Sequence, residues 1–219
     1  MTAVVKLTGE AAGYRGETVL SDVTLRIAEG ERVALVGESG VGKSTLLRLI
    51  YDRCGERAAL VPQDLGLVQS LSVFHNIYMG RLHLNSVWHN LRNLLRPAQS
   101  DVATVGAVVA ELRMEDKLFA AVGELSGGQQ QRTAVGRALY HPGDLLIADE
   151  PVSSVDQHQA REILATLNAR KKTVVLAMHD RALAIEFADR IVGIRDRRIV
   201  LDEATAGMTP SDLDHLYLV

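Results

Sequence analysis

The sequence predicts an α/β fold in which a layered β-sheet is covered by helices and carries a helical insertion. Two observations lead to this prediction. Short runs rich in β-branched residues, bounded by Gly, Asp and Pro, alternate with segments whose apolar residues recur at the helical period. Residues 71–122 differ, because they show only the helical period, with a break at Pro97. A helical bundle or an all-β sandwich would not show this alternation of strand-like and helical segments.

The first third of the chain contains strand-like segments on both sides of one predicted helix. Apolar and β-branched residues dominate these segments. The helix is expected over residues 44–54, and Pro62 ends the last strand. The predicted strands cover residues 4–7, 19–27, 32–36 and 57–61.

The last third contains two continuous apolar runs of strand length, at residues 144–148 and 173–178. Such runs are typical of strands buried on both faces of a parallel sheet. A helix is expected after each run, followed by a β-hairpin whose turn type the sequence leaves open. The predicted helices cover residues 157–170 and 181–188, and the hairpin strands cover 191–195 and 198–201 around Asp196 and Arg197.

Composition narrows the functional classes. The 219 residues include 24 Lys and Arg against 27 Asp and Glu, a net charge of −3, which argues against a general nucleic-acid binder with a basic face. The single cysteine, Cys54, cannot form an intrachain disulfide, and residues 1–20 lack a secretory pattern, so a reducing cytoplasmic setting is expected. No apolar run reaches the roughly 20 residues of a membrane span. A role at a membrane would come through a partner.

Residues 37–44, with the sequence GESGVGKS, match the nucleotide-binding P-loop and lie between a predicted strand and a predicted helix. The glycines let backbone N–H groups surround phosphate oxygens at a helix N-terminus. Lys43 would reach the β- and γ-phosphates, and the Ser44 hydroxyl would hold Mg²⁺. An ordinary Gly-rich turn would need neither side chain. The predicted ATP-binding residues here are Gly37, Glu38, Ser39, Gly40, Val41, Gly42, Lys43, Ser44 and Thr45.

Two adjacent carboxylates, Asp149 and Glu150, follow the apolar run at residues 144–148. Asp149 suits an indirect, water-mediated contact with Mg²⁺, and Glu150 suits the group that polarises an attacking water. The alternative is that these carboxylates cap the next helix. The upstream P-loop favours the catalytic interpretation.

Residues 125–132, LSGGQQQR, resemble the signature motif of the ATP-binding cassette (ABC) ATPases. Ser126 is a good N-cap, and the two following glycines leave helix N–H groups open to an anion. The resemblance implies a P-loop NTPase with a RecA-like core and an N-terminal antiparallel β portion, as one domain over residues 1–219. Its catalytic lobe would comprise 1–63 and 129–219, and its helical lobe 64–128. The signature residues are Leu125, Ser126, Gly127, Gly128 and Gln129.

Further motifs of the family match in order along the chain. Gln63 resembles the Q-loop glutamine, which senses Mg²⁺ and water and joins the two lobes. His179 resembles the switch histidine at the γ-phosphate, although a lone histidine is often structural. Tyr14 resembles the aromatic residue that stacks on adenine, with packing at a strand edge as the alternative. The D-loop would be Ser153, Ser154, Val155 and Asp156, in which Val155 departs from the more common Leu.

The resemblance also implies a mechanism that needs two chains. They would close head to tail on two ATP molecules, so that Ser126 of one chain faces the phosphate held by Lys43 of the other. Water oriented by Glu150 and His179 would attack in line and release ADP and phosphate. A monomer is then expected to hydrolyse ATP poorly.

Within the family, the chain looks most similar to the ATP-binding subunits of phosphonate importers, through three segments: QDLGLVQSLSVFHNIYMG at 63–80, LSGGQQQR at 125–132 and DLDHLY at 212–217. This implies a pair of transmembrane permeases, an extracytoplasmic substrate-binding protein and a peripheral position at the cytoplasmic face of the inner membrane. The groove for a permease helix would involve residues 64–81 and part of the helical segment that follows them. The segment between Lys43 and Gln63 is short for such an ATPase, and a β-hairpin there is expected to be missing.

Two other functions remain open at this point. The same motifs would serve an ABC system for lipoprotein or macrolide export, which a different membrane partner would distinguish. They would also serve a soluble ABC-type ATPase that acts in phosphonate breakdown or nucleic-acid maintenance. The acidic balance and the absence of coiled-coil arms argue against contact with nucleic acid. A non-hydrolysing regulatory module is disfavoured because Lys43, Asp149, Glu150 and His179 are all present.

Overall fold

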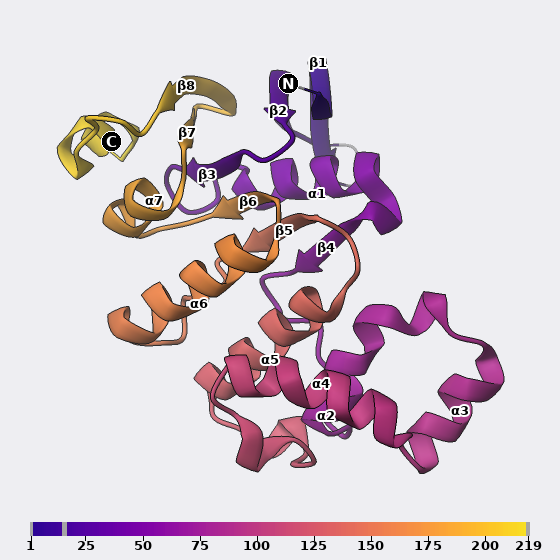
Figure 1. Cartoon of the computed structure of the whole chain (residues 1–219). Helices are drawn as coiled ribbons and strands as arrows, with labels where there is room; N and C mark the ends of the chain where they lie inside the picture. Colours follow the sequence, from indigo (N-terminus) through magenta and orange to yellow (C-terminus); the bar gives the residue numbers. More distant parts are fainter. Residues whose placement is uncertain (1, 15–16, 218–219) are drawn as a thin grey trace.

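The computed structural model describes residues 2–14 and 17–217. Its centre is a six-stranded sheet in the order β4-β5-β6-β3-β7-β8, in which all neighbours are parallel except β7 and β8 (Figure 1). The strands are β3 (Arg32–Val36), β4 (Ala58–Val61), β5 (Leu145–Asp149), β6 (Thr173–Ala177), β7 (Arg190–Arg195) and β8 (Arg198–Ala204). The α/β fold predicted from the sequence is therefore confirmed, and the strand ends of this sheet differ from the prediction by at most three residues.

The central strands are buried on both faces, as their continuous apolar runs predict. In β3, Val33 and Leu35 join one core, whereas Ala34 and Val36 join the other. The first core lies under helix α1 and the N-terminal strands, and the second lies under the remaining helices except α3, which contributes no residue to the cores of the described chain. The helices are α1 (Lys43–Cys54), α2 (Val73–Tyr78), α3 (Val87–Leu95), α4 (Gln99–Glu111), α5 (Gly127–Tyr140), α6 (Gln157–Arg170) and α7 (Arg181–Phe187).

The N-terminal strands form a separate antiparallel pair that packs beside α1 (Figure 1). β1 spans Ala3–Tyr14 and β2 spans Glu17–Ala28, so the prediction of a strand limited to residues 4–7 is too short. Val5 and Leu7 reach the core, but the later residues of β1 are polar or small. Main-chain pairing with β2, interrupted by register shifts, extends the strand beyond the apolar run.

The predicted hairpin at residues 190–204 is present, and the backbone decides its turn type. Asp196 has φ 49° and Arg197 has φ 64°, so both central residues are left-handed, as a type I′ turn requires. Asn-Gly is the usual signal for this turn, and its absence explains why the sequence left the type open.

The helical lobe occupies the lower part of Figure 1 and contains α2, α3 and α4. As predicted, residues 71–122 form no strand beyond an isolated bridge between Ser72 and Ala121, and Pro97 lies in the break between α3 and α4. Ser72 and Ser86 cap α2 and α3 by accepting backbone N–H bonds. Among the helices of residues 2–14 and 17–217, none combines the length and apolar content that crossing a bilayer requires.

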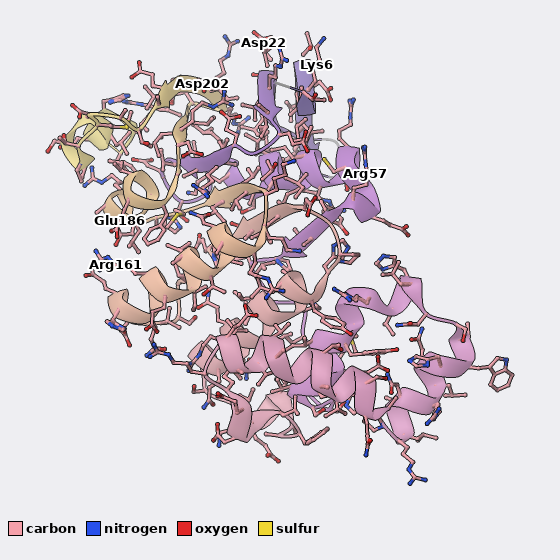
Figure 2. The ribbon with its side chains drawn as sticks, in the orientation of Figure 1. Lys6, Asp22, Arg57, Arg161, Glu186 and Asp202 are labelled. Carbon is pink, nitrogen blue, oxygen red and sulfur yellow. The ribbon has the colours of Figure 1, made fainter. Side chains whose placement is uncertain are left out.

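Surface charges join neighbouring helices of the other lobe. Figure 2 shows Arg161 of α6 and Glu186 of α7 facing each other, and their side chains form an ion pair at 3.1 Å. Both side chains are largely exposed, so this pair contributes at most about 1 kcal/mol. The two apolar cores, rather than such pairs, hold the helices on the sheet.

Two glycines allow α2 and the turn after it to approach α5 closely. A Cβ atom on Gly80 would lie 2.5 Å from the backbone oxygen of Arg137, and one on Gly136 would lie 2.7 Å from Cδ1 of Ile77. Each side therefore supplies one residue without a side chain. This contact fixes the helical lobe to the helix that also packs under the sheet.

We expect Gly80→Ala to lower the free energy of unfolding by about 1–3 kcal/mol, because the added methyl overlaps a backbone oxygen. Gly106→Ala in α4 is the matched control, since nothing lies within 4 Å of its Cβ position. Removing a helical glycine there should raise stability by about 0.5–1 kcal/mol. Urea unfolding of the two variants measures both effects, and equal changes would contradict the close contact.

Candidate functional site

The site lies where the parallel strands end. Leu35 of β3 and Asp149 of β5 are both in register with Ala177 of β6, so these three strands end at the same level. The P-loop follows β3, and His179 follows β6. Gln63 follows β4, the other neighbour of β5. Residues far apart in the sequence are thereby brought to one edge of the sheet.

The P-loop backbone needs its glycines. Gly37, Gly40 and Gly42 have φ of 143°, 79° and 113°, a region that side chains rarely allow. A Cβ on Gly37 would also lie 2.3 Å from the backbone oxygen of Ile194. Gly42 is the N-cap of α1 and supplies no side-chain acceptor, so the helix directs its first N–H groups toward the loop. The geometry suits an anion.

Lys43 lies inside this loop and is only 5% exposed. Its Nζ atom donates to the backbone oxygens of Gly37 at 2.8 Å and Glu38 at 2.9 Å. Burial lowers the pKa of Lys43, and the carboxylates of Glu150 and Asp149 oppose this shift. A buried ammonium group that faces an open helix N-terminus is a phosphate-binding arrangement.

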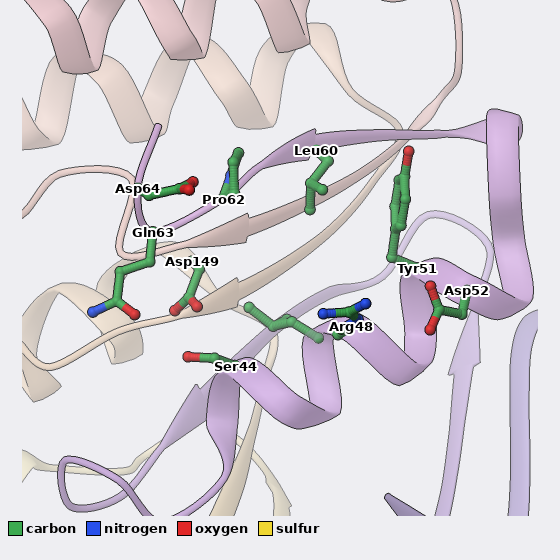
Figure 3. A pocket seen from close by; sticks show the side chains of 10 residues that line it. Ser44, Arg48, Tyr51, Asp52, Leu60, Pro62, Gln63, Asp64 and Asp149 are labelled. Atoms are coloured by element: carbon green, nitrogen blue, oxygen red, sulfur yellow. The ribbon is translucent and has the colours of Figure 1, made fainter. Parts of the chain in front are cut away.

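Asp149 has the properties of a cation ligand. Its Oδ1 atom is buried and has no hydrogen-bond partner among the described residues. Burial raises the pKa of Asp149, whereas a hydrogen bond with Ser44 lowers it. Figure 3 shows Asp149, Ser44 and Gln63 directed toward one another across a pocket of about 560 Å³. A carboxylate, a hydroxyl and an amide oxygen are ligands that suit Mg²⁺.

Glu150 and His179 meet directly. The Nε2 atom of His179 lies 2.6 Å from Oε1 of Glu150, and the Glu150 N–H donates to the backbone oxygen of Ala177 at 3.1 Å. The alternative that the two carboxylates cap the next helix is wrong. Asp156 is the N-cap of α6, and its Oδ1 accepts the N–H of Gln159 at 2.9 Å.

The signature motif forms a capped helix start that packs on the D-loop of the same chain. Ser126 accepts the N–H of Gln129, whose side chain accepts the N–H of Ser126 in return. A Cβ on Gly128 would lie 3.1 Å from the backbone oxygen of Ser154 and 3.2 Å from the side chain of Val155. In Figure 1, α5 begins in the lower lobe, away from the loop between β3 and α1. The structure therefore does not bring Ser126 to Lys43 of its own chain.

Gln131 is a site residue that the sequence reasoning missed. It is 1% exposed, and its Nε2 donates to the backbone oxygen of Glu150 at 2.8 Å. Its Oε1 accepts the N–H of Ser154 at 2.7 Å. Gln131 thus connects the signature helix with both Glu150 and the D-loop. One signal in the sequence could have found it. Gln131 precedes the buried Ala134 by three residues and the buried Val135 by four, so it shares their face of the helix.

Tyr217 is a second missed residue. Its hydroxyl accepts the N–H of Gly37, the first P-loop glycine, at 3.2 Å. Burial raises the pKa of Tyr217, and the Arg181 guanidinium lies 5.1 Å from its ring centre. Arg181 also pairs with Asp214. The C-terminal segment therefore supports the nucleotide loop, a role that its local sequence does not signal.

Two sequence predictions concern the surroundings of the site. The side chain of Tyr14 lies outside the described part of the chain, so its stacking on adenine stays a prediction. The expected loss of a hairpin after α1 is confirmed, because only the short turn Gly55–Arg57 joins α1 to β4. The 560 Å³ pocket lies between α1, which lines it with Arg48, Tyr51 and Asp52, and the end of β4, which lines it with Leu60.

Comparison with known proteins gives consistent matches over most of the chain. A family model described as ABC transporter matches residues 20–56 and 51–153. The chain is 36% identical over 244 residues to the phosphonates import ATP-binding protein PhnC of Pseudomonas putida, covering 98% of this chain and 90% of the relative. The protein of the same name from Pseudomonas entomophila is 38% identical over 239 residues, covering 95% and 90%.

Solved structures similar to this chain are also ABC transporter cassettes. A dimeric bacterial ABC transporter cassette superposes with a TM-score of 0.79 at 26% identity, covering 93% of this chain and 99% of that one. A nucleotide-free cassette from an ABC transporter has a TM-score of 0.79 at 19% identity over the whole of both chains, and supports the fold alone. Because the family model matches more than half of the chain and the relatives align with nearly all of it, this protein belongs to the ABC transporter family, as an ATP-binding cassette.

Proposed function

We propose that this chain is the ATP-hydrolysing subunit of an ABC importer for phosphonates or related phosphorus oxyanions. The observation that carries the ATPase activity is the convergence of the P-loop, Asp149 and the Glu150–His179 pair at one sheet edge. The substrate class comes from relatives at 32–38% identity that are named phosphonates import ATP-binding proteins.

The residues have distinct roles in this proposal. Lys43 and the P-loop N–H groups would bind the phosphates. Ser44, Gln63 and Asp149 would hold Mg²⁺, which would neutralise negative charge on the phosphates. Glu150 accepts a hydrogen bond from the attacking water and aligns it with the γ-phosphate. His179, at 2.6 Å from Glu150, fixes the orientation of that carboxylate. Positioning and charge stabilisation supply most of the rate.

The site requires a second cassette. The Ser126 turn packs on its own D-loop, and the N–H groups that begin α5 are available to an anion from another chain. Two copies closing head to tail would complete two sites, with the D-loops between them. The dimeric structure of a related cassette supports such pairing. Closure and opening of this pair would be the mechanical output of hydrolysis.

Arg137 of α5 links the nucleotide site with the expected permease contact. Its guanidinium donates to the backbone oxygens of Leu65 and Gly66, both at 2.6 Å, in the turn that follows Gln63. Leu65 and Gly66 have φ of 61° and 54°, so these bonds stabilise a left-handed backbone. A shift of Gln63 would reach α5 and the helical lobe through this contact.

The wider assembly follows from this role. A permease pair would dock against residues 64–81, and a substrate-binding protein would deliver the oxyanion from outside the cell. The chain would be peripheral at the cytoplasmic face of the membrane. Residues 1–63 and 129–219 would act as the catalytic lobe, and residues 64–128 as the helical lobe that transmits movement.

Co-purification tests the assignment. A tagged chain is isolated from gently solubilised native membranes, and its partners are identified by mass spectrometry. We expect a multi-spanning permease together with an oxyanion-binding protein. Recovery with an export permease, or only with soluble enzymes or nucleic acid, would contradict import while leaving the ATPase activity in place.

Glu150→Gln is expected to lower the rate of ATP hydrolysis about 100-fold or more and to retain nucleotide binding, because only proton acceptance is lost. ATP turnover and nucleotide affinity are measured on the same preparation. Glu203→Gln, at an exposed position of β8, is the matched control and should leave turnover unchanged. Undiminished hydrolysis in Glu150→Gln would remove this residue from its role.

Mixing variants tests the shared site. Ser126→Arg and Lys43→Ala should each abolish hydrolysis alone, the first by blocking the partner's site and the second by removing phosphate binding. A mixed dimer keeps one site built from the intact Lys43 and the intact Ser126. We therefore expect mixing to restore ATP occlusion and turnover, and a mixture as inactive as its components would contradict head-to-tail pairing.

Mg²⁺ binding should depend on pH through Asp149. Because burial raises the pKa of Asp149, this carboxylate takes up a proton at a higher pH than an exposed aspartate does. The protonated form is a poor cation ligand, so Mg²⁺ affinity should fall as pH falls and begin to fall above the usual aspartate range. Mg²⁺ titrations of nucleotide binding across pH measure this, and Asp149→Asn should weaken binding and abolish the dependence.

A further inference from the structure

Helix α3 directs its apolar side to solvent. Val87, Trp88 and Leu95 are 79%, 79% and 82% exposed, and Leu91 and Leu94 are about half exposed. At 3.6 residues per turn these five side chains share roughly one third of the helix circumference. A surface helix normally buries such a face and exposes the opposite one. Leu82 and Leu84, just before α3, extend the apolar surface.

The polar side of α3 attaches it to the protein. Asn93 is 1% exposed, and its amide donates to Oδ2 of Asp101 in α4 at 2.7 Å. His89 contacts the same oxygen at 2.8 Å. Asn90 accepts the hydroxyl hydrogen of Tyr78 at 2.9 Å. Three specific polar contacts thus hold the helix with its apolar face outward, so the exposure is built into the fold.

The charged residues of this segment of the sequence have one sign. Residues 65–100 contain no Asp or Glu, whereas Arg92 and Arg96 follow the apolar face around the helix. Within the described residues, neither arginine belongs to an ion pair. Asp101, the first acidic residue after this stretch, is hydrogen-bonded to Asn93 and His89. Figure 1 places α3 at the outer end of the helical lobe, away from the sheet.

We propose that α3 and residues 82–84 bind the surface of an anionic lipid bilayer. Exposed leucines, a tryptophan and flanking arginines without acidic neighbours are the composition of an interfacial helix. Arginine attracts anionic headgroups, and tryptophan suits the boundary between headgroups and acyl chains. A protein partner would require complementary acidic groups opposite the arginines, so a bilayer fits the charge pattern without further assumptions.

This contact goes beyond the proposed transport function and does not require nucleotide. It would orient the helical lobe against the membrane independently of the permease. Vesicle binding is measured without ATP, so its failure would leave the ATPase activity standing, and loss of ATPase activity would leave this contact standing.

Trp88 is the only tryptophan in the chain, so its fluorescence reports on this helix alone. The full-length protein is mixed with vesicles of phosphatidylglycerol and phosphatidylcholine, or of phosphatidylcholine alone, and co-sedimentation is measured in parallel. We expect a blue shift of Trp88 emission and co-sedimentation with the anionic vesicles, both weakened by salt. Zwitterionic vesicles should bind much less.

Variants identify the face responsible. Leu95→Asp should weaken partitioning about tenfold or more, because it removes apolar contact and adds a repelled charge. Val200→Asp, at a 51% exposed site on β8, is the matched control and should bind like the parent. Replacing Arg92 and Arg96 with Gln should lower affinity for anionic vesicles about tenfold. Hydrolysis of ATP should be unchanged in all three.

An unshifted Trp88 emission with anionic vesicles would overturn the proposal. A shift that occurs only in the presence of the purified permease would also overturn it and assign α3 to a protein interface. Equal effects of Leu95→Asp and Val200→Asp would do the same, because binding would then lie outside this face.

Discussion

The parallel pairing of β3, β6 and β5 is the constraint on which the rest of the site depends. It brings the P-loop, His179 and the Asp149–Glu150 pair to one edge of the sheet. Each group alone would be unfavourable there, because Lys43 is buried and Asp149 has a buried oxygen without a partner. Opposite charges close together offset part of this cost. Polyphosphate and a divalent cation would satisfy the remainder.

Helix α5 connects this edge to the helical lobe. Gln131 binds the backbone of Glu150 and of the D-loop, while Arg137, further along the same helix, binds the turn after Gln63. Because a helix moves as a rigid body, a displacement of α5 changes both contacts together. The close approach of Gly80 and Gly136 ties α2 to the same helix. These specific hydrogen bonds and packing contacts therefore couple the two lobes.

Two local features distinguish this chain: a short connection between α1 and β4, and an exposed apolar face on α3. A single turn joins α1 to β4, and a pocket lined by Arg48 and Tyr51 lies between these two elements. In the helical lobe, α3 keeps its polar residues against the protein and turns leucines and Trp88 outward. An apolar face in water is unfavourable, and contact with another surface would relieve this cost. The two features lie on opposite sides of α2 in the sequence.

The sequence by itself determined the alternation of buried strands and helices, because a strand buried on both faces must be apolar throughout. It also determined the P-loop and the carboxylates, since phosphate and metal binding require particular residues at short spacing. Tertiary structure alone decided the length of β1, which depends on pairing with β2, and the turn at Asp196–Arg197. It likewise decided the contacts of Gln131 and Tyr217 and the outward direction of the apolar face of α3. These contacts and this orientation depend on which elements pack against one another, and the periodicity of a local segment does not indicate which element it packs against.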